Sequence, residues 1–99
     1  MLRITTQEET RLITFVLEGK CRGAWVDELE RCWRSTAAAA AGRNLRVDLR
    51  NVGFVDDRGK ELLTQMCTQG VQLVAAGPMM TSLVEEIAAS CPKTVKQRA

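Results

Sequence analysis

Three charged side chains, Asp56, Asp57 and Arg58, precede a segment with helical apolar periodicity, and their types allow several kinds of chemistry. Paired carboxylates can act as a general acid and a general base. At the start of a helix, however, a carboxylate usually accepts hydrogen bonds from free backbone N–H groups and favours the positive helix end. We therefore interpret Asp56 and Asp57 as a helix cap and a charge that complements the helix dipole. Arg58 could clamp a phosphate or carboxylate, although a lone exposed arginine is more often only solvated.

A second candidate site is the short basic loop that contains Lys20, Arg22 and Gly23, between a predicted strand and a predicted helix. A helix N-terminus can bind an anion through its free N–H groups, and the two cations would add positive charge. A loop with two charges is usually just solvated. Binding of an anion or a small ligand here is therefore the weaker hypothesis.

The cysteines give no sign of catalysis or of a metal site. The chain has four cysteines and no histidine, and no two cysteines form a C-x-x-C pair. Neither a zinc site nor a thiol activated by a base is predicted. Cys32 and Cys67 occupy apolar helical positions, whereas Cys21 and Cys91 lie near the ends of elements and could be exposed. We predict no enzyme activity, no metal and no cofactor.

Length and charge indicate one domain without a nucleic-acid surface. A chain of 99 residues with 45% apolar and 26% charged residues is typical of a single folded module. Lys93, Lys96 and Arg98 belong to a C-terminal tail, so residues 1–92 carry 11 basic and 12 acidic residues. Nucleic-acid binding needs clustered positive charge, which this balance does not favour.

The chain shows neither a secretory signal nor a membrane span. Residues 1–4 lack the charged region and apolar stretch of a signal peptide, and no apolar run approaches the roughly 18 residues of a membrane span. We therefore expect a cytoplasmic protein with free thiols and no membrane insertion.

Apolar periodicity predicts alternating strands and helices. Residues 12–17 form a nearly unbroken β-branched and aromatic run, which predicts a central strand covered on both faces. Residues 24 to about 40 predict an amphipathic helix, in which Trp25 and Trp33 share one face and pack in the core rather than stack on a ligand. The other predicted elements are strands at 2–5, 45–50 and 71–75 and helices at 59–70 and 79–90.

This order, β-β-α-β-α-β-α, predicts an α/β sandwich with its helices mainly on one side of the sheet. We expect one domain over residues 1–92. Residues 93–99 form a basic tail without apolar pattern, which we expect to be frayed.

The same order, together with two short motifs, resembles the STAS domain family. The motifs are Glu18-Gly19 after the second predicted strand and the segment Val-Asp-Leu…Val-x-Phe-Val-Asp-x-x-Gly within residues 47–59. The family includes bacterial anti-sigma factor antagonists and the cytoplasmic tails of sulfate transporters. The resemblance implies a four- or five-stranded mixed sheet. It also implies that antagonists dock on a kinase-like anti-sigma factor through an Asp-Ser-Ser-Gly corner, whose second serine is phosphorylated to end docking.

In this chain the corner reads Asp56-Asp57-Arg58-Gly59, so Arg58 occupies the position of the phosphorylated serine. Phosphorylation adds about −1.5 to −2 charges, whereas arginine carries a fixed positive charge. The usual switch cannot operate at this position. A hydroxyl on the next helix, at Thr64 or Thr68, could take over that role.

Three functions are compatible with this pattern. The first is a non-enzymatic STAS-type interaction module that binds an anti-sigma or kinase-like regulator. The second is an accessory subunit that binds the ATPase of a lipid or anion transporter, and the third is a small-ligand or nucleotide sensor. The oligomeric state stays open and includes a homodimer. The expected partner contacts are Asp56, Asp57, Arg58, Gly59, Lys60 and Leu63.

Overall fold

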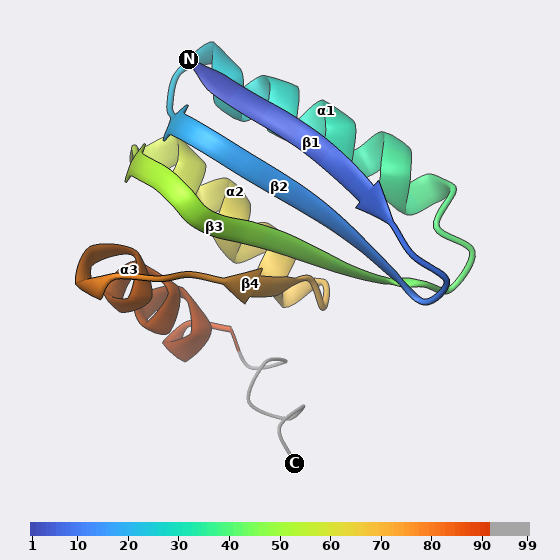
Figure 1. The fold of residues 1–99 in the computed structure, drawn as a ribbon. Coiled ribbons are helices and arrows are strands. Elements are labelled where there is room, and N and C mark those ends of the chain that lie inside the picture. The colour runs from blue at the N-terminus through green and yellow to red at the C-terminus, as the bar shows by residue number, and fades with distance from the viewer. Residues whose placement is uncertain (92–99) are drawn as a thin grey trace.

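The structure is a computed structural model that describes residues 1–91. Four strands and three helices alternate as the sequence predicts (Figure 1). Their bounds are β1 Leu2–Glu8, β2 Leu12–Cys21, α1 Ala24–Ala38, β3 Asn44–Val55, α2 Asp57–Thr68, β4 Gln72–Val74 and α3 Pro78–Ala89. The predicted basic tail, residues 93–99, lies outside the described residues.

The strands form one mixed sheet in the order β1-β2-β3-β4. β1 pairs antiparallel with β2, whereas β2 with β3 and β3 with β4 pair in parallel. β2 lies between β1 and β3, which confirms its predicted place inside the sheet. Since each parallel connection contains one helix, the carboxyl ends of β2 and β3 and the starts of α1 and α2 meet at one edge (Figure 1).

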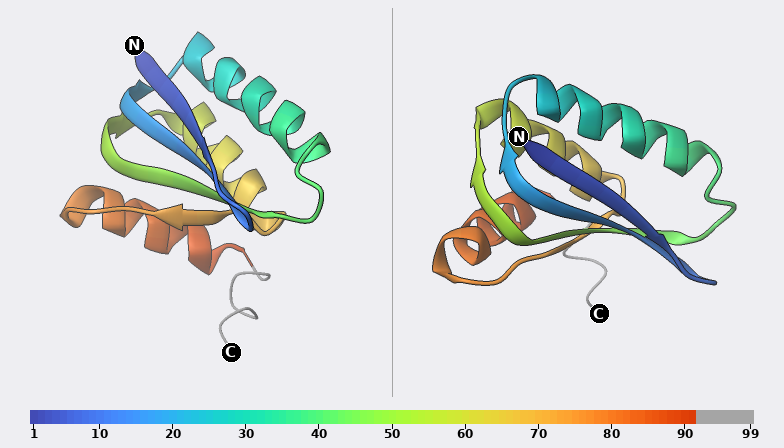
Figure 2. Two further views of the ribbon diagram at one scale, coloured as in Figure 1. Left: turned by 45° about the vertical axis from the view of Figure 1, so that its right-hand side comes forward. Right: turned by 45° about the horizontal axis from the view of Figure 1, so that its top comes forward.

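The three helices lie side by side on one face of the sheet. α1 contacts α2, and α2 contacts α3. Both views in Figure 2 show this row of helices on the same side. The mixed α/β sandwich with its helices on one side is therefore confirmed.

The core lies between this helix row and the sheet. On β2 and β3 the inward residues alternate with outward ones, and Phe15, Leu17, Val47 and Leu49 are fully buried. Burying a side chain of this size stabilises a fold by about 1.5–3 kcal/mol. The helices contribute three clusters of buried residues: Val26, Leu29 and Trp33 from α1; Leu62, Leu63, Met66 and Cys67 from α2; and Met80 and Ile87 from α3.

The second face of β2 is covered less fully than predicted. Thr14 is buried among neighbouring side chains, but Val16 is only partly buried, and within residues 1–91 no helix lies over this face. On β3 the same face carries Asp48, whose carboxylate accepts two hydrogen bonds from the Arg50 guanidinium at 3.0 and 2.8 Å. These bonds lower the pKa of Asp48 and satisfy a buried charge.

Other predictions about single residues or element ends were wrong. β1 and β3 continue to Glu8 and Val55, beyond their predicted ends at residues 5 and 50. α1 ends at Ala38 rather than near Ala40. Trp25 is 38% exposed, so only Trp33 packs in the core. Cys21 and Cys91, which could be exposed according to the sequence, are fully buried members of the core.

Leu63→Ala should lower the free energy of unfolding by about 2–5 kcal/mol, because it leaves a cavity where a fully buried side chain stood. Urea denaturation would measure the change. Met79→Ala on α3 is the control, since Met79 is 66% exposed and should change stability by no more than about 0.5 kcal/mol. Small, equal effects at both positions would contradict the packing of α2 against the sheet.

Candidate functional site

The candidate site lies at the edge of the sheet where β2 and β3 end. We define the corner as residues 56–60 together with the loop 20–23. Asp56 directly follows β3 and precedes α2, and the segment 20–23 contains the last two residues of β2 and the two residues that join it to α1. The parallel pairing of β2 with β3 places these two connections next to each other, and the Asp56 N–H donates a hydrogen bond to the Cys21 carbonyl at 3.1 Å.

Asp56 ties the starts of both helices together. One carboxylate oxygen accepts from the Gly59 N–H at 2.8 Å and so caps α2. The other oxygen accepts from the Gly23 N–H at 2.9 Å, immediately before α1. The bond from Gly23 and, to a smaller extent, the bond from Gly59 lower the pKa of Asp56, because they favour its charged form. The predicted capping role of Asp56 is confirmed.

Gly59 is required by close packing rather than by a special backbone angle. A Cβ atom at this position would lie 2.9 Å from Val55 Cγ1, 3.0 Å from the Cys21 carbonyl oxygen and 3.3 Å from Asp56 Oδ1. A hydrogen side chain therefore lets the first turn of α2 approach the ends of both strands.

Arg58 is held across the corner by α1. Its guanidinium donates to Asp27 Oδ1 at 2.5 Å and to the Gly23 carbonyl at 3.5 Å. The side chains of Arg58 and Asp27 are 57% and 53% exposed. An ion pair this exposed contributes only about 0–1 kcal/mol, so a partner could replace it at small cost. No pattern in the sequence indicates that Asp27, from a different element, faces Arg58.

The other expected contact residues differ in exposure. Asp57 is exposed in the first turn of α2, and none of the ion pairs found within residues 1–91 involves it. Lys60 pairs with Glu86 of α3 at 2.9 Å. Gly59 and Leu63 are buried, so the expectation that they contact a partner directly does not agree with their burial. Among residues 56–60, Asp57 and Arg58 are exposed and Lys60 is partly exposed.

The basic loop is less suited to an anion than its sequence suggests. Lys20 and Arg22 are exposed, but the Gly23 N–H that would face an anion already donates to Asp56. An anion at the start of α1 would have to displace this carboxylate. In this structure the loop therefore provides one of the two N–H groups that donate to the Asp56 carboxylate.

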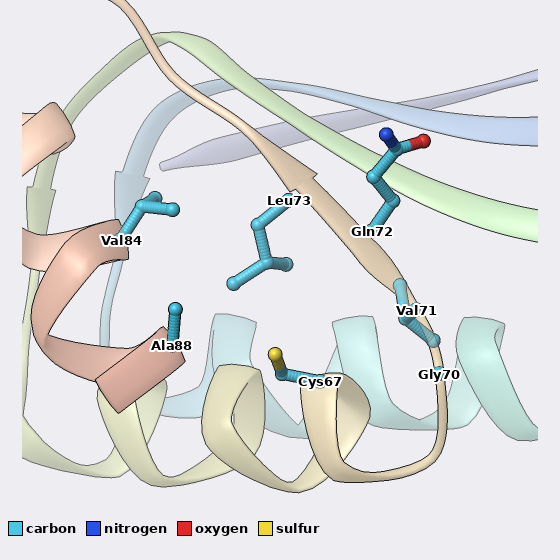
Figure 3. Close-up of a pocket in the computed structure, with 7 residues that line it drawn as sticks. All are labelled: Cys67, Gly70, Val71, Gln72, Leu73, Val84 and Ala88. Atoms are coloured by element: carbon cyan, nitrogen blue, oxygen red, sulfur yellow. The ribbon is translucent and has the colours of Figure 1, made fainter. Parts of the chain in front are cut away.

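An open hollow of about 440 Å³ is lined by Asp57, Lys60, Glu61 and Thr64 of α2. Two smaller hollows also lie along this helix. One, of about 150 Å³, lies between α1 and α2 beside Arg58 and is lined by Val26, Glu30, Glu61, Leu62 and Gln65 as well. The other, of about 80 Å³, lies at the opposite end of α2, where Leu73 of β4 and Cys67 of α2 face the α3 residues Val84 and Ala88 (Figure 3). Both are smaller than the roughly 300–1,000 Å³ of typical small-molecule sites.

The corner offers hydrogen bonding and charge but no reactive group of the usual kinds. Burial raises the pKa of the Cys21 thiol to about 11, so this cysteine stays protonated and unreactive at neutral pH. Within residues 1–91 no group of three or more His, Cys, Asp or Glu residues could hold a metal ion. None of the helices in that range is long and apolar enough to cross a membrane.

The hydroxyls of Thr64 and Thr68 are engaged within α2. Thr64 Oγ1 donates to the Lys60 carbonyl at 2.8 Å, and Thr68 Oγ1 donates to the Thr64 carbonyl at 2.9 Å. Phosphorylation of either residue would first have to break a bond to the helix backbone. Thr64 is also partly buried, whereas Thr68 is exposed.

Gly59→Ala should lower the melting temperature, although alanine favours a helix over glycine by about 1 kcal/mol. The new methyl group would crowd Val55 and the Cys21 carbonyl. Gly53→Ala is the matched control, since no heavy atom lies within 4 Å of its Cβ position and its φ is not positive. Thermal unfolding followed by circular dichroism would compare the two variants. Stabilisation by Gly59→Ala would show that the corner is looser than described.

Asp56→Asn should remove a pH-dependent part of the stability. The folded-state pKa lies below the ordinary value of 3.8, so in the acid range the unfolded chain binds a proton more readily than the folded chain. The contribution of Asp56 is therefore present above its unfolded-state pKa of 3.8 and is lost as the pH falls through the lower folded-state pKa. We expect the stability difference between wild type and variant to shrink over that range, as measured by thermal unfolding at a series of pH values. A difference that does not vary with pH would contradict this role, and Asp57→Asn, with no capping bond, controls for charge removal.

Comparison with known proteins identifies the fold. No protein-family model matches the chain, and no curated protein matches it in sequence. Among solved structures, an uncharacterised protein of the DUF3478 family from Shewanella loihica PV-4, described as having a SpoIIAA-like fold, superposes with a TM-score of 0.59. The two are 11% identical, and the match covers 92% of this chain and 80% of the other.

A second solved structure, the protein Mglu, matches a smaller part of the chain. It is 19% identical over 76% of this chain with a TM-score of 0.56, and the chain spans about 19% of the length of Mglu. Identities this low show a common fold and no more. Together with the strand order and the single row of helices, they establish that this chain has the SpoIIAA-like fold, which is the fold of STAS domains.

Proposed function

We propose that this domain is a non-enzymatic STAS-type interaction module that binds a partner protein through its corner. The observation that carries the proposal is the double hydrogen bond of Asp56, which fixes the backbone on both sides of the exposed charges. Asp57 and Arg58 are presented from this fixed backbone. Fixed charges of both signs favour specific recognition of another protein, because they steer encounter and set register.

Docking at this corner is not controlled by phosphorylation of the residue at position 58. The arginine there already forms an ion pair with Asp27, and its charge is opposite to that of a phosphoserine. A partner that accepts a neutral hydroxyl would meet a bulky cation in its place. Control of binding must therefore come from elsewhere, for example from the amount of protein or from the partner.

The class of partner follows from the STAS resemblance and divides into two. An anti-sigma or kinase-like regulator would make the domain part of bacterial signalling and regulation of transcription. An ABC-type ATPase would make it an accessory subunit of a transporter. Cross-linking in cells of the source organism, followed by purification of the captured complex, would decide between them.

Reversing the exposed charges of the corner should weaken binding of the purified partner by at least about tenfold, which corresponds to about 1.4 kcal/mol. The variant is Asp57→Arg combined with Arg58→Glu, and isothermal titration calorimetry would give its affinity. Arg11→Glu is the control, because Arg11 is exposed in the turn before β2, at the other end of the sheet. Unchanged affinity in the corner variant, with the fold intact by circular dichroism, would overturn the proposed contact.

A further inference from the structure

An apolar hollow of about 290 Å³ lies beside the corner, between the end of β3 and α3. Two of the most exposed large apolar side chains in residues 1–91 line it, Phe54 at 43% and Met79 at 66% exposure. Its other lining residues are Gly53, Val55, Met80, Ser82, Leu83 and Glu86. An exposed apolar patch with a concave centre is typical of a surface that another molecule covers.

The strand lengths explain why this surface is open. β4 pairs only with residues 46–48 of β3, so the last part of β3, up to Val55, has no strand beside it on that side. The pairing of β2 with β3 also shifts between Gly19 and Lys20, which leaves Gly53 as an extra, unpaired residue. Such a bulge re-aims the side chain that follows it. The following residue is Phe54.

One basic side chain, that of Lys20, lies beside Phe54 on the neighbouring strand. Phe54 pairs in register with Lys20 on β2, and residues paired in this way project from the same face of a sheet. Lys20 is exposed, and none of the ion pairs found in the described part of the chain involves it. The one carboxylate that lines the hollow, Glu86, is neutralised by Lys60 at 2.9 Å. Binding of an apolar side chain in the hollow would therefore be stronger if carboxylates lie next to that side chain in the partner.

We propose that this hollow receives one aliphatic or aromatic side chain of a partner protein, from a segment that carries carboxylates beside that side chain. The inference rests on the proposed role as an interaction module and adds a second contact surface to the corner. An apolar anchor that fills a pocket can supply most of the affinity of an interface. Met79 suits such a pocket, because its flexible side chain adapts to the shape that enters.

The hollow and the corner form one continuous surface. Val55 lines the hollow and directly precedes Asp56, and the Lys60–Glu86 ion pair joins α2 of the corner to α3 of the hollow. A partner segment could therefore place its anchor beside Phe54 and reach the charges of Asp57 and Arg58. The anchor would provide affinity, and the corner would provide specificity.

Synthetic peptides test the chemistry of the occupant directly. We would titrate the ¹⁵N-labelled domain with three peptides of equal length: a leucine flanked by glutamates, the same leucine flanked by lysines, and the glutamates with alanine in place of leucine. The first should bind with a Kd of about 1 mM or lower and shift the amide signals of Phe54, Met79 and Leu83. The other two should bind at least about tenfold more weakly. No binding by the first peptide, or equal binding by all three, would overturn the proposal.

Variants locate the binding and separate the two surfaces. Phe54→Ala should weaken binding of the first peptide by at least about tenfold. Lys20→Glu should shift the preference toward the lysine-flanked peptide. Trp25→Ala should leave the affinity unchanged, because Trp25 does not line the hollow. Loss of peptide binding in Arg58→Glu but not in Phe54→Ala would assign the peptide to the corner, so that this inference fails while the proposed function stands.

One further result would change the identity of the occupant, and another would separate the hollow from the corner. Sedimentation velocity should show a monomer at the protein concentration of the titration. Self-association that Phe54→Ala abolishes would mean that a second copy of this chain fills the hollow, and it would overturn the inference. The second result concerns the corner. If the peptide binds at the hollow but the charge-reversed variant binds the purified partner with unchanged affinity, the hollow is supported as a contact surface and the corner is not.

Discussion

The organisation of the candidate surface depends on one carboxylate that accepts hydrogen bonds from two different helix starts. The Asp56 side chain satisfies the Gly59 N–H at the start of α2 and the Gly23 N–H before α1. The parallel pairing of β2 with β3 brings these groups together, and the carboxylate then holds them. Free N–H groups at a helix start must find some acceptor, and here a single residue serves both sites. The absence of a side chain at Gly59 allows the close approach that this arrangement needs.

The exposed charged side chains are held more weakly than the backbone that carries them. Arg58 with Asp27 and Lys60 with Glu86 are surface ion pairs between separate helices, each of them weak in water. A partner can exchange such pairs for its own without disturbing the capping bonds beneath. The domain therefore combines a fixed frame with side chains that are free to change partners. Next to them, the hollow around Phe54 offers apolar area, which is the usual source of affinity in protein interfaces.

Much of the fold could be predicted from apolar periodicity, because the sheet and the helices each bury one face. The order of the elements, the inner position of β2 and the cap at Asp56 follow from such local patterns. What could not be predicted depends on contacts between elements distant in sequence. Asp27 faces Arg58 only because two helix starts meet, and the Trp25 ring is exposed because α1 turns Val26, Leu29 and Trp33 toward the sheet. Likewise, the open hollow results from the short pairing of β4, which no residue pattern reveals.

The dense packing at Gly59 and the double role of Asp56 have a consequence for how this surface can evolve. Substitutions at these two positions should damage the architecture, so folding restricts them whichever molecule is bound. Positions 57, 58 and 60 are not restricted in this way, since their side chains extend into solvent or form weak pairs. Duplicated copies of such a gene could thus acquire new binding preferences through three substitutions while inheriting an unaltered scaffold.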